Sequence, residues 1–173
     1  AGTPAGVSGV QLHFASSDVF TPGDNPDVLV DMNPAALKVN VGELPANAIV
    51  IVDAEAFTDQ NLKKAGYAAN PLTDGSLDRY QLFKLDITKM TLNAMEGLNL
   101  PPRTQMRSRN FFALGVVSWL FQRPIDPTIR WIERKFKKNP AVAEANVRVL
   151  KAGFNFGDTT ELFSTSYEIA PAA

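Results

Sequence analysis

The sequence predicts an α/β protein with three layers (α/β/α), a mainly parallel sheet and a helical C-terminal third. Two continuous apolar runs, residues 28–30 and 48–52, are typical of strands that are covered on both faces. Each run, and a third alternating segment at 80–87, precedes a helical pattern. This order predicts parallel strands joined by right-handed crossovers. A chain of 173 residues is expected to form one domain, spanning 1–173.

The prediction of the first strand, residues 7–15, depends only on the alternation of apolar and polar side chains. Val10, Leu12 and Phe14 alternate with Gln11 and His13, so the three apolar side chains should share the face toward the core. We interpret His13, the single histidine of the chain, as a solvated strand residue rather than a catalytic one.

The segment after it is expected to form a strand, a sharp turn and a helix. Asn33 offers a short side chain that can cap a helix N-terminus, and Pro34 stands where a missing N–H does least harm. The helix should cover residues 34–41 and end at Gly42 as a C-cap. Open α/β sheets bind ligands beyond the carboxyl ends of their strands. The turn that begins at Asp31 is therefore the first candidate ligand site.

The middle of the chain repeats the pattern of strand and helix. The β-branched residues at 48–52 favour an interior strand. Thr58 should cap a helix that Gly66 ends, and a loop at 69–76 should lead into the strand at 80–87. That strand is expected nearer an edge of the sheet and is followed by a helix at 88–97.

The last third is expected to be helical. Apolar residues recur at helical spacing over 103–122. Gly115 in this helix costs roughly 1 kcal/mol against alanine, and it therefore predicts a close backbone approach. Further helices are expected at 127–136 and 141–152, whereas the tail after Gly153 has no clear period.

Composition excludes several classes of function. Seventeen basic residues against eighteen acidic ones produce no net field that would favour nucleic acid or an anionic membrane. The chain has no cysteine, so it supplies no thiol nucleophile and no cysteine ligand for zinc or iron–sulfur clusters. The longest strongly apolar run, 111–121, is too short to span a bilayer. Since no signal-peptide pattern opens the chain, we expect a cytoplasmic protein.

Motifs that would carry catalysis are absent from the sequence, but two groups of residues are candidates for ligand binding. There is no glycine-rich phosphate loop and no set of residues spaced to hold a metal. Asp31 and Asn33 lie at the rim where α/β sheets bind ligands, although strand-end carboxylates are often solvated or capping. Arg107, Arg109 and Asn110 lie near a helix start, where guanidiniums can face phosphate or form an ordinary polar surface. We take these five as candidate cofactor-binding residues, with no catalytic and no metal-binding residue.

An ordered set of short segments resembles a known family. The segments are residues 26–37 (PDVLVDMNPAAL), 65–67 (AGY), 70–72 (NPL), 75–77 (GSL), 109–115 (RNFFALG), 131–136 (WIERKF), 143–147 (AEANV), 150–153 (LKAG) and 157–161 (GDTTE). Together they resemble the gamma domain of 2-oxoacid:ferredoxin oxidoreductases, closest to the 2-oxoglutarate type, in which this domain is fused ahead of the alpha domain. No single segment is decisive, but the ordered set is specific and runs over nearly the whole chain.

The resemblance implies a part in a larger enzyme. Such enzymes convert a 2-oxoacid and coenzyme A to an acyl-CoA and carbon dioxide and pass two electrons to ferredoxin, using thiamine diphosphate and [4Fe-4S] clusters. The family's thiamine and cluster sites belong to its alpha, beta and cysteine-bearing parts. The gamma domain helps to hold the assembly together and lies near coenzyme A. The resemblance thus implies a non-catalytic domain with alpha and beta partners.

Two departures from the family lead to a further expectation. The glycine-rich segment that precedes this region in the family has no counterpart here, and the chain stops near the family's linker to the alpha domain. We therefore expect a fragment that does not fold stably alone, because its sheet would lack its first strand. Two alternatives are a stand-alone α/β module that binds a nucleotide-like or acyl-CoA ligand and a purely structural interaction domain.

Overall fold

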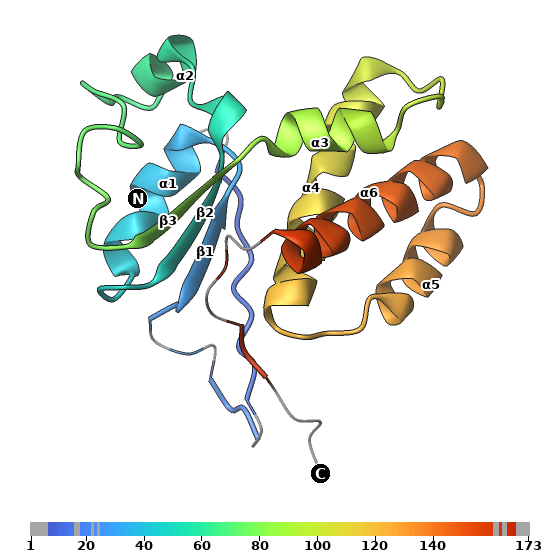
Figure 1. The fold of residues 1–173 in the computed structure, drawn as a ribbon, viewed down its shortest axis with the longest axis horizontal. Coiled ribbons are helices and arrows are strands. Elements are labelled where there is room, and N and C mark those ends of the chain that lie inside the picture. Colours follow the sequence, from blue (N-terminus) through green and yellow to red (C-terminus); the bar gives the residue numbers. More distant parts are fainter. Residues whose placement is uncertain are drawn as a thin grey trace. The chain divides into compact units, whose positions relative to one another are not determined.

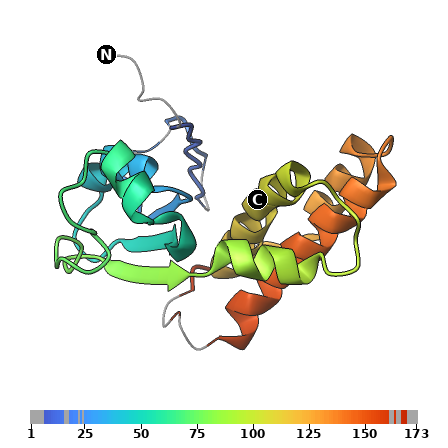
Figure 2. The same cartoon turned by 90° about the horizontal axis from the view of Figure 1, so that it is seen from above.

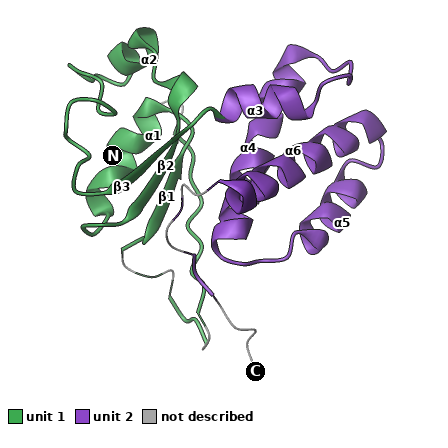
Figure 3. Cartoon of the chain, in the orientation of Figure 1, with its two compact units in different colours: residues 1–86, 172–173 green, residues 87–171 purple. Residues whose placement is uncertain are grey.

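The structure is a computed structural model that describes residues 7–15, 18–21, 23, 25–160, 163 and 166–168. It divides into two compact units with the boundary between Asp86 and Ile87 (Figure 3). The first unit holds the sheet and the second is helical (Figure 1). The α/β class, the parallel sheet and the helical C-terminal third are confirmed. The single-domain organisation stays a prediction.

Three parallel strands form the sheet of the first unit. They run in the order β1-β2-β3, with Val28 opposite Ile49 and Ile49 opposite Gln81 at the start of the register. Their bounds are β1 Val28–Asp31, β2 Ile49–Asp53 and β3 Gln81–Leu85. Every residue of β2 is buried, as its apolar run predicted. The apolar residues of β1 are only half-buried, because β1 is an edge strand of the three.

Two short helices of this unit cover one face of β2. The helices are α1 (Pro34–Asn40) and α2 (Asp59–Lys64), and short 3₁₀ segments occupy Val41–Glu43 and Ala54–Ala56. Leu37 of α1 and Leu62 of α2 pack with Val50 and Val52 of β2 in one apolar cluster. The alternation of Val50 and Val52 along the strand places both on the same face, so this face carries the core of the unit. The layer expected on the other face stays a prediction.

The strand expected at residues 7–15 does not form. These residues have no regular structure, and Val10 and Leu12 are 85% and 63% exposed. His13 is exposed as expected, and its Nδ1 lies 3.0 Å from the carbonyl oxygen of Thr21. Alternation favours a strand only where a neighbouring strand and an apolar surface accept it, and the segment has neither among the described residues.

The end of α1 also differs from the prediction. Gly42 is no left-handed C-cap, because the chain passes from Asn40 directly into the 3₁₀ segment that contains Gly42. The backbone N–H of Val41 donates to Leu37 O and closes the last turn. Gly66, in contrast, ends α2 with φ +73° as predicted. Thr58 caps that helix by accepting the N–H of Asn61 at 3.3 Å.

Among the residues that the structure describes, four helices form the second unit. They are α3 (Ile87–Ala94), α4 (Pro102–Leu120), α5 (Asp126–Lys135) and α6 (Pro140–Thr159). The long helices α4 and α6 cross each other in both views (Figure 2). At the crossing, a Cβ placed on Gly115 of α4 would lie 2.7 Å from Phe154 N, and one on Gly153 of α6 would lie 2.9 Å from Phe112 C. The close approach predicted at Gly115 is therefore confirmed.

The last helix is longer than expected. It continues past Gly153 to Thr159, where the sequence predicted an irregular tail. Gly153 and Gly157 are both buried, and Gly157 lies against the ring of Trp119. The two glycines therefore serve helix packing rather than helix termination, a role that depends on a neighbouring helix and leaves no local signal.

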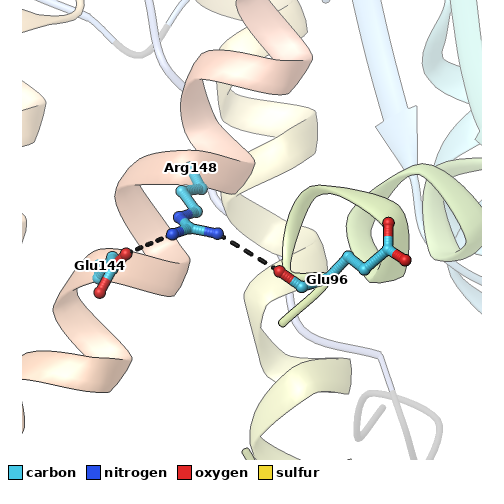
Figure 4. Close-up of polar contacts among 3 residues, drawn as sticks. All are labelled: Glu96, Glu144 and Arg148. Carbon is cyan, nitrogen blue, oxygen red and sulfur yellow. Dashed lines mark hydrogen bonds and ion pairs between the residues drawn. The ribbon is translucent and has the colours of Figure 1, made fainter. Parts of the chain in front are cut away.

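Arg148 joins α6 to the turn that follows α3 (Figure 4). Its guanidinium donates to the Glu144 carboxylate one helical turn away and, at 3.4 Å, to the carbonyl oxygen of Glu96. Both members of the ion pair are about half-exposed, so the pair adds little stability, and the contact with the turn is the hydrogen bond to Glu96.

Candidate functional site

The turn after β1 is built by a helix cap. Asn33 has an extended backbone, and its Oδ1 accepts the N–H of Ala36 at 3.0 Å. Pro34 follows at the first helical position and is buried. The sequence predicted both features from the residue types alone. The capping bond uses one lone pair of Oδ1, so a ligand could meet the NH₂ group of Asn33 or the second lone pair of Oδ1.

Asp31 lies inside the fold at the end of β1. Its side chain is 3% exposed, and its Oδ2 has no hydrogen-bond partner among the described residues. Burial raises the pKa of this carboxyl to about 6, although a hydrogen bond from the Asn40 side chain opposes the shift. Asp31 is thus an internal group that titrates near neutral pH, whereas the sequence placed it at an open rim.

Tyr67 is the ionisable neighbour of Asp31. Burial, followed by the negative charges of Asp31 and Asp74, raises the pKa of the Tyr67 phenol to about 12. Lys38 Nζ lies 5.0 Å from the centre of the Tyr67 ring and donates to the carbonyl oxygens of Ala65 and Gly66 at 3.0 and 2.7 Å. The Lys38 ammonium therefore satisfies the end of α2 and packs on an aromatic face.

The second group of candidates is divided between two sides of α4. Arg109 donates through Nε to Met106 O and through Nη1 to Thr88 Oγ1, each at 3.1 Å. It thereby joins α4 to α3. Arg107 and Asn110 are exposed and three residues apart, so they share one face of the helix. Arg109 is turned about 200° from Arg107 at the helical spacing of 100° per residue.

The two groups of candidates belong to different units. Asp31 and Asn33 lie in the first unit, and the three residues of α4 lie in the second. No group of three or more metal-ligating side chains occurs among the residues that the structure describes. Within the same residues, no helix is long and apolar enough to cross a bilayer.

Sequence reasoning missed a hollow at the ends of α4 and α6. It has a volume of about 410 Å³ and is lined by Trp119, Gln122, Arg123, Pro124, Phe154, Asp158 and Ser166. Aromatic walls with one cation and one anion are a composition that suits small polar ligands. The hollow depends on the last turns of α6, which the sequence did not predict, and no local motif marks it.

Comparison with known proteins gives a consistent result. A family model described as pyruvate ferredoxin/flavodoxin oxidoreductase matches residues 4–156. Over 172 residues the chain is 48% identical to the 2-oxoglutarate oxidoreductase subunit KorA of Mycobacterium tuberculosis. The aligned region covers 99% of this chain and 26% of KorA. The fold is similar to that of a 2-oxoglutarate:ferredoxin oxidoreductase from Magnetococcus marinus, solved with 2-oxoglutarate, coenzyme A and succinyl-CoA bound. The TM-score is 0.64 and the identity 18%, over 91% of this chain and 24% of that one. The chain therefore spans about a quarter of each of these relatives.

Proposed function

Because this chain belongs to the pyruvate ferredoxin/flavodoxin oxidoreductase family, we propose that it is the gamma-type domain of a 2-oxoglutarate:ferredoxin oxidoreductase. The whole enzyme would convert 2-oxoglutarate, coenzyme A and oxidised ferredoxin to succinyl-CoA, carbon dioxide and reduced ferredoxin. The observation that carries the proposal is the 48% identity to KorA over 99% of this chain. The resemblance in the ordered segments of the sequence is thereby confirmed at the level of the family.

The domain would serve assembly and the coenzyme A side of the site rather than catalysis. Thiamine diphosphate and the iron–sulfur clusters would be bound by the alpha and beta parts, since this chain has no cysteine and its described residues form no metal-ligand group. A cytoplasmic location and ferredoxin as the electron acceptor belong to the same proposal.

Among the five candidate residues, Arg107 and Asn110 fit coenzyme A best. Both are exposed on α4, and a guanidinium beside an amide can bind a phosphate through several N–H donors. Asn33 and Arg109 already make hydrogen bonds within the fold, and Asp31 is a buried acid. Arg109 would support the α4 surface that coenzyme A approaches, whereas Asp31 and Asn33 belong to the first unit.

Purification of the protein from its source tests the proposal. We expect a brown complex with a thiamine-bearing partner that reduces ferredoxin when both 2-oxoglutarate and coenzyme A are present. Arg107→Ala should raise the KM for coenzyme A about tenfold, the loss of roughly 1.4 kcal/mol. Arg134→Ala, an exposed arginine of α5, should leave that KM unchanged. A colourless protein without partners that binds coenzyme A at micromolar concentration would instead support the stand-alone binding module.

A further inference from the structure

The outward face of α4 combines arginines with large apolar side chains. Residues three and four apart on a helix share a face, and this spacing aligns Arg103, Met106, Arg107, Asn110 and Leu114. All five are exposed, with Met106 at 40% and Leu114 at 37% of their full surface. The opposite side of α4, including Phe112 and Val116, is buried. We name the outward residues the α4 stripe.

An aromatic cluster extends the stripe to α5. Phe111 follows Arg107 by one helical turn, and its ring lies 6.4 Å from that of Phe136. Phe136 in turn contacts Trp131 at the same ring separation, and Trp131 is 46% exposed. The two ring contacts thus join the stripe to Trp131.

The composition of this surface is that of a protein interface. Methionine, arginine and tryptophan are enriched at the centres of interfaces, whereas lysine, glutamate and aspartate are depleted. The 19 residues of α4 include no lysine, glutamate or aspartate. A free surface helix of this length ordinarily carries both charge signs along its exposed side. The side chains of α4 therefore suit contact with a protein better than contact with water.

The charges of the stripe select the chemistry of the partner. The first turn of α4 contains Arg103 and no acidic residue, although the helix dipole favours anions at this end. An anionic group on a partner would complement the guanidiniums of Arg103 and Arg107 on this face. Beside this anionic group, the partner would offer an apolar surface to Met106 and Leu114.

We propose that the α4 stripe and Trp131 dock another part of the same oxidoreductase through a surface of carboxylates around an apolar centre. The inference rests on the proposed function, in which about three quarters of a KorA-like protein lies outside this chain. Arg107 and Asn110 then lie at a junction between parts of the enzyme, and small-molecule sites occur preferentially at such junctions.

Hydroxyl-radical footprinting of the purified holoenzyme tests the docking surface. Met106 and Trp131 are among the side-chain types most readily oxidised by radicals, so they report on their own exposure. In the wild-type holoenzyme we expect both to be oxidised at least fivefold more slowly than in a proteolytic peptide that contains them. Arg103→Glu and Leu114→Asp should each raise the oxidation of Met106 and Trp131 severalfold.

Two matched variants serve as controls. Leu92→Asp introduces a charge at a leucine that is 42% exposed on α3, and Lys138→Glu reverses an exposed charge after α5. Neither should change the oxidation of Met106 or Trp131. Urea midpoints equal to that of the wild type establish that the stripe variants are folded.

The outcomes separate the docking surface from the proposed function. An active wild-type holoenzyme whose Met106 and Trp131 are oxidised at the peptide rate overturns the docking surface alone. Stripe variants that keep the wild-type footprint of Met106 and Trp131 overturn it as well, because a weakened contact would expose both side chains. A protein that purifies without partners and without activity overturns both the docking surface and the proposed function.

Discussion

Substitution of Gly115 by alanine tests the helix crossing that organises the second unit. A Cβ at this position would collide with the carbonyl oxygen of Leu150 and lie 2.7 Å from Phe154 N. Both are backbone atoms of α6, so a flexible side chain cannot give way and the two helices must separate. The methyl group that normally stabilises a helix should therefore destabilise this protein.

The magnitude follows from two opposing effects. Alanine in place of glycine in a helix interior contributes about 1 kcal/mol of stability. Overpacking of a core costs typically about 1–3 kcal/mol, and contact with backbone atoms favours the upper end of that range. The free energy of unfolding should therefore fall by about 2 kcal/mol. For a chain of this size this loss lowers the melting temperature by roughly 4–8 °C.

Hydrogen exchange of peptides from the second unit, followed across a urea series in the purified holoenzyme, measures the effect. The exchange of α4 and α6 reports on the unit that contains Gly115. Gly42→Ala is the matched control, since a Cβ there meets no atom within 4 Å and its φ is not positive. A Gly115→Ala protein with an unchanged or higher urea midpoint would show that the helices do not cross at this glycine.

Two further predictions concern the turn after β1. The carboxyl of Asp31 has its pKa raised by burial from 3.8 to about 6, so the native state binds more protons than the unfolded state between these values, and stability falls as the pH rises from about 4 to 6. Asp31→Asn should remove this fall and stabilise the protein at pH 8 by about 2–3 kcal/mol. Urea midpoints measured across this pH range check the prediction, and a variant that keeps the wild-type fall in stability would contradict it. Asn33→Ala removes the cap on Ala36 N–H and should cost about 1 kcal/mol, whereas Asn33→Asp should cost little. Equal urea midpoints for the two Asn33 variants would show that the cap contributes nothing.

The candidate site was predictable where one residue type determines the local geometry. Asn33 caps its helix as expected because its short side chain can reach the N–H groups of the first turn. The environment of Asp31 was not predictable, since the side chain is buried by the tertiary fold and its charge acts on Tyr67, a residue far along the chain. Helical spacing alone places Arg109 and Arg107 on different sides of α4. The hydrogen bond from Arg109 to Thr88 on α3 could not be predicted from the sequence.

The parallel sheet, the order of its strands and helices, and the family could all be predicted from the amino-acid sequence. The buried run of β2, the caps at Asn33 and Thr58 and the packing role of Gly115 are all local features, and the structure agrees with them. Two features depend on the packing of the whole fold: residues 7–15 form no strand, and α6 continues through Gly153 to Thr159. Neither an alternating pattern of side chains nor a glycine specifies a secondary structure by itself. An alternating segment becomes a strand only beside another strand, and a glycine continues a helix where a second helix packs against it.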